Sequence, residues 1–254
     1  MANSHGDHIW YELLTTDPDG AAAFYTEVVG WKVRSAGQEG MDYRLLASPD
    51  TDIGGLMTLP QGAPMPPTWL GYVGVSDVDA KAAKVTELGG VVHMPPTDIP
   101  GIGRFAMVAD PQGAVFYMMR GASVRESTAF KPMAAGHCGW NELVTSDQDG
   151  ALGFYDKLFG WEKGDAIPMG EMGDYRFINH RGQMIGAVMN RREGGPPPMW
   201  NYYFRVAGID AAAERIRAGG GSVTSGPMEV PGGDWVVNGI DLQGVSFGLV
   251  GSKA

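Results

Sequence analysis

The sequence predicts an α+β protein in which one domain-sized unit occurs twice. The first observation is a repeat: Trp10-Tyr11-Glu12-Leu13 returns as Trp140-Asn141-Glu142-Leu143. The second is that strand-like and helix-like patterns follow in the same order in both copies. Because the period is longer than those of solenoids and propellers, each copy is expected to form a domain.

The composition is that of a globular protein without membrane spans. Of 254 residues, 44% are hydrophobic and 19% are charged, and no apolar run reaches the roughly 18 residues that a spanning helix requires. A net charge of −10 disfavours nucleic acid and anionic membranes as partners. The single cysteine, Cys138, cannot form an internal disulfide, and residues 1–8 lack a signal-peptide pattern. We expect a cytoplasmic protein.

The first strand is expected over residues 10–15, and a helix follows it. Asp17 is a typical N-cap residue, Pro18 suits the first helical position, and Gly30 suits the helix end. The second copy keeps these signals except the proline. Apolar residues share one helical face at Ala21, Phe24, Tyr25 and Val28, and again at Ala151, Phe154, Tyr155 and Leu158.

The rest of each copy predicts short strands and a second helix. In the first copy, strands are expected at 43–47, 53–59, 69–75, 91–94, 104–109 and 114–119. Val78, Ala82 and Val85 share a helical face that ends at Gly89-Gly90. Each copy therefore reads as strand, helix and three strands, written twice. We expect domains over 1–120 and 137–254, joined by a linker over 121–136.

Several motifs resemble those of the vicinal oxygen chelate superfamily. This superfamily includes glyoxalase I, extradiol dioxygenases and bleomycin-resistance proteins. The motifs are Trp-x-Glu-Leu, Phe-Tyr before Gly-Trp in the first helix, and the turn Asp110-Pro111-Gln112-Gly113, matched by Asp241-Leu242-Gln243-Gly244. The chain looks most like two-domain glyoxalase-like proteins of actinobacteria. This resemblance implies paired βαβββ units that form an open, U-shaped mixed sheet, with helices outside and the ligand on the concave face.

The resemblance also implies a divalent metal held by His, Gln or Glu, and here this sequence departs from the family. Indole, glycine and aliphatic groups are not ligands for such metals. We therefore expect no metal and no cofactor. The matching positions are Trp10 and Trp140, then Trp69 or Gly71 with Trp200 and Tyr202, then Tyr117 and Gly248, while 54–56 and 186–188 offer no ligand.

Two readings remain open for the first strands, where Trp10 and Glu12, and Trp140 and Glu142, share a face. In the structural reading, the carboxylates pair with Arg44 and Arg176. In the functional reading, the indoles stack on a ligand and the glutamates accept a hydrogen bond or a proton. The predicted catalytic residues are Glu12, Tyr117 and Glu142, and the predicted ligand-binding residues are Trp10, Arg44, Trp69, Trp140, Arg176, Trp200 and Tyr202.

Tyr117 is expected to face the cleft, where its hydroxyl could hold a carbonyl oxygen. Gly248, its counterpart, is expected to leave space, so that the two clefts would be unequal. The leading hypothesis is a protein that binds a small aromatic or carbonyl metabolite without the usual metal, either as a binding protein or as a metal-independent lyase or isomerase. The alternatives are a sequestering resistance protein and a metal-dependent lactoylglutathione-lyase-like enzyme with a rebuilt site. We expect a monomer or a homodimer.

Overall fold

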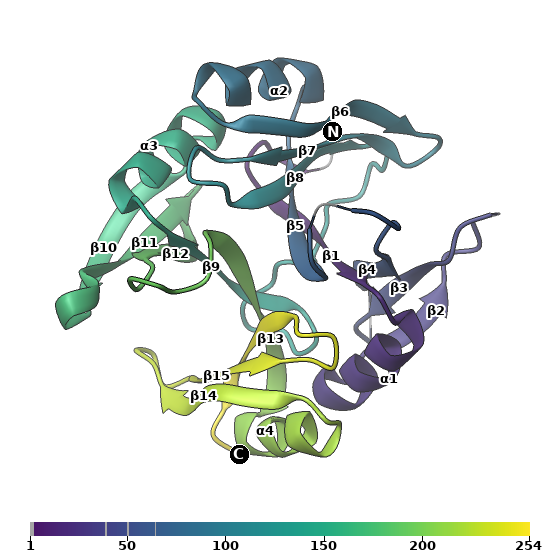
Figure 1. The fold of residues 1–254 in the computed structure, drawn as a ribbon, viewed down its shortest axis with the longest axis vertical. Coiled ribbons are helices and arrows are strands. Elements are labelled where there is room, and N and C mark those ends of the chain that lie inside the picture. The colour runs from purple at the N-terminus through teal and green to yellow at the C-terminus, as the bar shows by residue number, and fades with distance from the viewer. Residues whose placement is uncertain (1–2, 39, 50, 64) are drawn as a thin grey trace. The chain divides into compact units, whose positions relative to one another are not determined.

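The structure is a computed structural model that describes residues 3–38, 40–49, 51–63 and 65–254. Within these residues the chain forms four α-helices, one 3-10 turn and two eight-stranded sheets (Figure 1). None of the helices in this part of the chain is both long and apolar enough to cross a membrane.

The first sheet has the strand order β2-β3-β4-β1-β5-β8-β7-β6, and the second repeats it as β10-β11-β12-β9-β13-β16-β15-β14. β1 pairs with β4, and β5 with β8, in parallel, whereas β7 pairs with β8 in antiparallel fashion, so the first sheet is mixed. The predicted α+β class with two tandem copies is confirmed. The first copy comprises β1 (His8–Thr15), α1 (Pro18–Val29), β2 (Lys32–Ser35), β3 (Tyr43–Ala47), β4 (Asp52–Thr58), β5 (Thr68–Gly74), α2 (Val78–Glu87), β6 (Val91–Ile99), β7 (Gly103–Ala109) and β8 (Val115–Gly121). The second comprises β9 (Cys138–Thr145), α3 (Gln148–Phe159), β10 (Glu162–Pro168), a 3-10 turn (Gly170–Met172), β11 (Asp174–His180), β12 (Gln183–Asn190), β13 (Met199–Gly208), α4 (Ile209–Ala218), β14 (Ser222–Glu229), β15 (Trp235–Ile240) and β16 (Ser246–Ser252).

The expected helix signals act as predicted. Asp17 caps α1 by accepting a hydrogen bond from Gly20 N at 2.9 Å, and Gly30 ends the helix with φ of 91°. Asp147 caps α3 in the same way at 3.0 Å, and Gly160 ends it with φ of 73°. Glycine adopts this left-handed conformation without the strain that a Cβ would cause.

β2 and β10 are absent from the predicted strand positions, although three strands are expected after each helix. Both lie at a sheet edge and pair on one side only. β2 is mostly exposed, and an edge strand of this kind needs no apolar alternation. β6 continues through Pro95 and Pro96 to Ile99, well beyond the predicted end at 94, because an edge strand tolerates proline.

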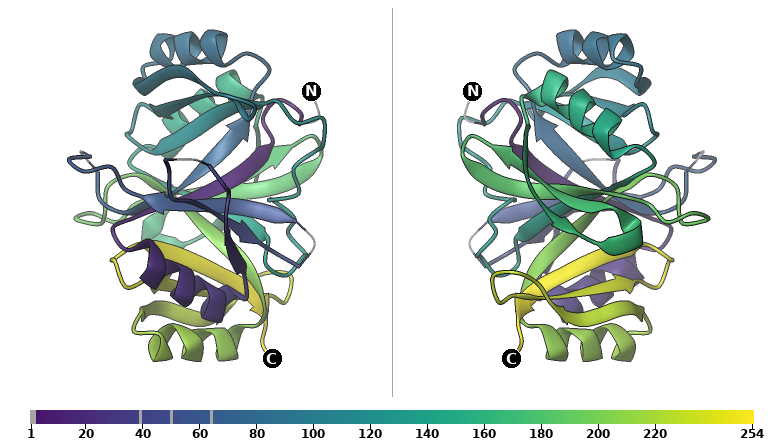
Figure 2. Two further views of the ribbon diagram at one scale, coloured as in Figure 1. Left: turned by 90° about the vertical axis from the view of Figure 1, so that its right-hand side faces the viewer. Right: turned by 90° about the vertical axis from the view of Figure 1, so that its left-hand side faces the viewer.

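The chain forms two compact units, and each combines segments from both copies. One contains the segment ending at Ile9, Gly71–Ser127 and Asn141–Trp200; we call it unit 1. Unit 2 contains Trp10–Leu70, Thr128–Trp140 and Asn201–Ala254. Within unit 1, α2 lies beside α3, and within unit 2, α1 lies beside α4 (Figure 1, Figure 2). The domain limits of 1–120 and 137–254 follow the sequence repeat and stay a prediction.

A buried Trp–Tyr–Asp chain joins the copies within unit 2. The Trp69 indole donates to the Tyr25 hydroxyl at 3.0 Å, and this hydroxyl donates to Asp241 at 3.0 Å. Asp241 also accepts from the backbone N–H groups of Gln243 and Val245, both at 2.9 Å. Burial raises the pKa of Asp241 and that of Tyr25. The Phe-Tyr motif of one copy is thereby attached to the last turn of the other.

Unit 1 contains the equivalent chain with the copies exchanged. Trp200 donates to Tyr155 at 2.9 Å, and Tyr155 donates to Asp110 at 3.1 Å. Burial raises the pKa of Asp110 as well. The tryptophans of the Gly-Trp motifs add a second link of this kind: Trp31 donates to Gly136 O in unit 2 at 2.7 Å, and Trp161 donates to Gly6 O in unit 1 at 2.9 Å. The motifs shared by the copies therefore hold each unit together.

Candidate functional site

An aromatic and acidic cluster lies on β1 and β3 in unit 2. The Trp10 indole donates to the Tyr43 hydroxyl at 2.9 Å, and this hydroxyl donates to the Glu12 carboxylate at 2.8 Å. Trp10 and Tyr43 are half-buried, whereas Glu12 is 4% exposed. Trp10 and Glu12 share a face because strand side chains alternate, as expected. The cluster presents two rings above a buried carboxylate.

The second copy builds a similar pair in unit 1, where Tyr175 donates to Glu142 at 2.8 Å. Glu142 is half-buried and therefore more accessible than Glu12. Trp140 belongs to unit 2 and is half-buried. Neither tyrosine is among the predicted site residues, although both occur in the repeated Asp-Tyr-Arg motif. Alternation along this motif places the tyrosine on one face and the aspartate and arginine on the other, but it does not say which face meets the glutamate.

The ion pairs expected for the glutamates are corrected by the structure. Arg44 pairs with Asp19 and Asp42, each at 2.7 Å, and Arg176 pairs with Asp174 at 2.7 Å. The physical reason is that Tyr43 and Arg44 are neighbours on one strand, so their side chains point to opposite faces. Hydrogen bonding from Arg44 lowers the pKa of Asp42. The arginines thus form ion pairs with aspartates. The glutamates accept hydrogen bonds from tyrosines in place of the expected arginines.

Three of the predicted ligand-binding aromatics are buried in packing. Trp69 and Trp200 are 3% and 4% exposed, and their indoles belong to the Trp–Tyr–Asp chains. Tyr202 is 1% exposed and packs edge-on against Tyr11, with ring centroids 5.1 Å apart. The proposed ligand site therefore does not include these three residues.

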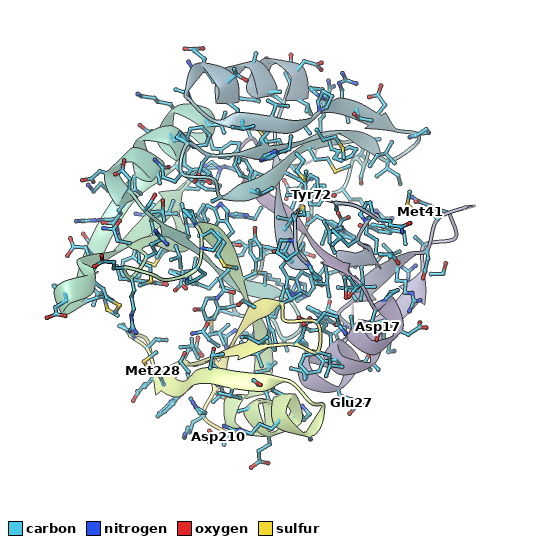
Figure 3. All side chains as sticks on the ribbon, in the orientation of Figure 1. Asp17, Glu27, Met41, Tyr72, Asp210 and Met228 are labelled. Carbon is cyan, nitrogen blue, oxygen red and sulfur yellow. The ribbon has the colours of Figure 1, made fainter. Side chains whose placement is uncertain are left out.

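On β5 and β13, the residues next to these three aromatics point to the opposite face of the sheet, because side chains alternate along a strand. In the first copy this face carries Leu70 and Tyr72, and in the second it carries Asn201 and Tyr203. Tyr72, labelled in Figure 3, stacks on Tyr117 with ring centroids 4.3 Å apart, and both rings are 5% exposed. Tyr117 is thus a member of a ring pair within unit 1.

The space expected at Gly248 is filled. A Cβ at this glycine would lie 2.3 Å from a ring carbon of Tyr203, which is its register partner on the adjacent strand. The prediction of an open gap is therefore wrong, because the absent side chain of Gly248 is replaced by a neighbouring ring. The two copies still differ at this position, since Tyr117 meets Tyr72 as a second ring in the first copy.

The side chains at the family's metal positions do not fit a divalent cation. Indole and glycine supply no ligand, and a phenol is a poor substitute for carboxylate or imidazole. Among the described residues, moreover, no three His, Cys, Asp or Glu side chains lie together in a way that could hold a metal.

Two buried groups near the first strands stay uncharged at neutral pH. Burial raises the pKa of the Cys138 thiol to about 12, and the thiol contacts Trp140 O at 3.3 Å. His8, the counterpart of Cys138, has its pKa lowered to about 3 by burial and by nearby His180. A thiol with so high a pKa is a poor nucleophile.

The sequence and the fold together define the class of protein. The family model described as "Glyoxalase/Bleomycin resistance protein/Dioxygenase superfamily" matches residues 7–117 and 134–244. The chain belongs to this superfamily, and both copies match it.

Two kinds of relatives are similar in sequence. The chain is 30% identical over 259 residues to the anthracycline biosynthesis protein DauV of Streptomyces sp. (strain C5), covering 96% of this chain and 93% of DauV. It is 45% identical over 123 residues to the putative glyoxylase CFP32 of Mycobacterium bovis, covering 48% of this chain and 47% of CFP32. The match therefore spans about half the length of the mycobacterial protein.

Solved structures share the fold at low sequence identity. A variant of homoprotocatechuate 2,3-dioxygenase from B. fuscum superposes with a TM-score of 0.70 at 18% identity, covering 98% of this chain and 72% of that one. The Mn(II)-bound glyoxalase from Novosphingobium aromaticivorans gives 0.64 at 18% identity, covering 98% and 82%. Identities this low support the fold alone.

Proposed function

We propose that this protein binds a small planar aromatic or carbonyl-containing metabolite without the divalent metal of its superfamily. The observation that supports the proposal is the Trp10–Tyr43–Glu12 cluster, in which two half-buried rings adjoin a carboxylate, and Trp10 stands where the resemblance implies a metal ligand. Ligand sites commonly combine aromatic walls with a few oriented polar groups. The name of DauV, an anthracycline biosynthesis protein, supports an aromatic ligand.

In the enzymatic form of the proposal, the glutamates move a proton. Glu12 accepts a hydrogen bond from Tyr43, so this phenol would orient the carboxylate toward a substrate C–H or O–H group. Glu142 and Tyr175 would do the same in unit 1. The reaction class would then be that of a lyase or isomerase acting next to a carbonyl group.

A second candidate is sequestration of a cationic drug. The net charge of −10 favours it, since an acidic surface concentrates cationic ligands. Binding that leaves the mass of the ligand unchanged would support sequestration, whereas a new product would support enzymatic turnover.

The test begins with elemental analysis of protein purified without a metal-affinity tag. We expect substoichiometric zinc, nickel, manganese and iron, and no rise in melting temperature when these ions are added. Tightly held metal at one equivalent per chain would overturn the metal-free proposal.

The second step is calorimetric titration of the wild type, Trp10→Ala and Glu12→Gln with 2-naphthol, a planar aromatic probe. We expect binding by the wild type and at least tenfold weaker binding by Trp10→Ala, because a stacked ring contributes about 1 kcal/mol or more beyond its buried area. Leu242→Ala changes an exposed residue in a turn and serves as the matched control. Failure of the wild type to bind would contradict the proposal.

A further inference from the structure

The two copies carry chemically different rows of side chains on matching strands. In unit 1, register pairs connect Tyr72 with Tyr117, Tyr117 with Met107, and Met107 with Met94. All four residues face away from Phe116 and Met118, the buried neighbours of Tyr117. This row on β5, β8, β7 and β6 is aromatic and sulfur-rich.

The matching row in unit 2 is polar. Register pairs connect Tyr203 with Gly248, Gly248 with Asn238, and Asn238 with Ser225. Asn201 takes the place of Leu70, two residues before the tyrosine. Asn238 and Ser225 therefore stand where the first copy has Met107 and Met94. We call Asn201, Asn238 and Ser225 the amide row.

The amide row is a hydrogen-bonded chain that ends in an acceptor without a hydrogen-bond partner. Asn201 Nδ2 donates to Asn238 Oδ1 at 3.2 Å, and Asn238 Nδ2 donates to Ser225 Oγ at 2.9 Å. The first bond joins β13 to β15 across β16, and the second joins the adjacent strands β15 and β14. Asn201 Oδ1 is shielded from solvent and accepts no hydrogen bond from the described residues, although the Asn201 side chain as a whole is only half-buried.

A buried acceptor without a partner lowers the stability of the folded chain, and a ligand that supplies a donor removes this penalty. Tyr203 follows Asn201 by two residues on the same face of β13, and its ring, which is 5% exposed, packs against Gly248. A planar ring with a hydroxyl group matches both features.

We infer that the amide row is a recognition site for a planar aromatic ligand that bears a hydroxyl group, and that Asn201 Oδ1 accepts the hydrogen bond from this group. The inference rests on the proposed function, because it names the class of the aromatic ligand. In the first copy Leu70 stands at the position of Asn201 and its side chain supplies no acceptor, so discrimination of the hydroxyl group resides in the second copy.

The test compares 2-naphthol with 2-methoxynaphthalene by calorimetric titration, since these probes differ in the hydroxyl donor. We expect the wild type to bind 2-naphthol about tenfold more tightly, which corresponds to about 1.4 kcal/mol. Asn201→Leu, which installs the residue of the first copy, should bind both probes within twofold of each other. Leu70→Ala, at the matching position of the first copy, should keep the tenfold preference.

Two further variants allow the test to be completed if Asn201→Leu does not fold. Asn201→Asp keeps an acceptor oxygen and should keep the preference, and Asn201→Ala replaces the leucine variant if that variant does not fold. Equal binding of both probes by the wild type, or a preference that survives in Asn201→Leu or Asn201→Ala, overturns the inference and leaves the proposed function intact. If the wild type binds neither probe, the proposed function fails and the inference fails with it.

Discussion

The helix-facing sides of the two copies are nearly the same, whereas their opposite faces differ. Trp69–Tyr25–Asp241 and Trp200–Tyr155–Asp110 are one hydrogen-bonded chain built twice, with distances of 2.9–3.1 Å in both units. On the other face, Tyr117 and two methionines in the first copy become Gly248, Asn238 and Ser225 in the second. The shared Trp–Tyr–Asp chains build the scaffold, and the differing rows are expected to give the two copies different ligand preferences.

The largest effect is expected from the aspartates of the shared chains. Asp241→Ala and Asp110→Ala should each lower the free energy of unfolding by about 3 kcal/mol, because each leaves a buried tyrosine hydroxyl and backbone N–H groups without an acceptor. Chemical denaturation of both variants measures the losses. Losses that differ by more than twofold would contradict the view that the two Trp–Tyr–Asp chains are equivalent.

The next effect compares His8 with its counterpart Cys138. The folded-state pKa of His8 is about 3, below the value of 6.5 for the free side chain, so the unfolded chain binds the proton more readily. Stability is therefore lost as pH falls below about 6.5, and the loss reaches about 2 kcal/mol at pH 5.

His8→Cys installs the residue of the second copy and should remove this loss, since a thiol does not titrate in that range. Denaturation of the variant and the wild type at pH 7 and pH 5 measures the difference. Parallel losses in the two proteins would show that His8 is not the group responsible.

A smaller effect separates the two glutamate sites. Tyr43→Phe removes a hydrogen bond to Glu12, which is 4% exposed, and the acceptor for the Trp10 indole. Tyr175→Phe removes the bond to the half-buried Glu142. We expect losses of about 2 and 1 kcal/mol in unfolding free energy, because an unsatisfied group costs more where burial is greater. The reverse order would contradict the burial argument.

The smallest effect concerns the residue beside each glutamate. Gly55 is the register partner of Glu12, and a Cβ there would lie 2.0 Å from the Tyr43 hydroxyl. Ala187 occupies the matching position beside Glu142, where Tyr175 keeps its 2.8 Å bond.

Gly55→Ala should therefore tilt the Tyr43 ring, whose hydroxyl and Cζ atoms would lie 2.0 and 2.3 Å from the new Cβ, at a cost of about 1 kcal/mol. Ala187→Gly is the reciprocal control, and thermal denaturation compares the two. A cost above about 2 kcal/mol for Gly55→Ala would mean that the phenol cannot adjust in the first copy as it does in the second.

Local patterns were sufficient for much of the fold. The caps at Asp17 and Asp147, the ends at Gly30 and Gly160, and the tandem arrangement follow from residues close in sequence. The edge strands β2 and β10 were missed, because exposed strands that pair on one side carry no alternation.

The candidate site could be predicted only in part. Trp10 and Glu12 were found because a strand places alternate residues on one face. The partner of Glu12 was assigned to Arg44 instead of Tyr43, an error of one residue that reverses the face. The same shift moved Trp69 and Trp200 into the ligand set, although both belong to the buried chains.

The sequence by itself determined the repeat, the class and the order of its elements, because these depend on spacings within a few turns or strands. Tertiary structure alone decided that each compact unit draws on both copies, that tyrosines hold the glutamates, and that Asn201 carries an unpaired acceptor. Those features depend on which distant strands become neighbours and on which side chains reach across them. Pairing between distant segments is a property of the packed chain, and no local pattern encodes it.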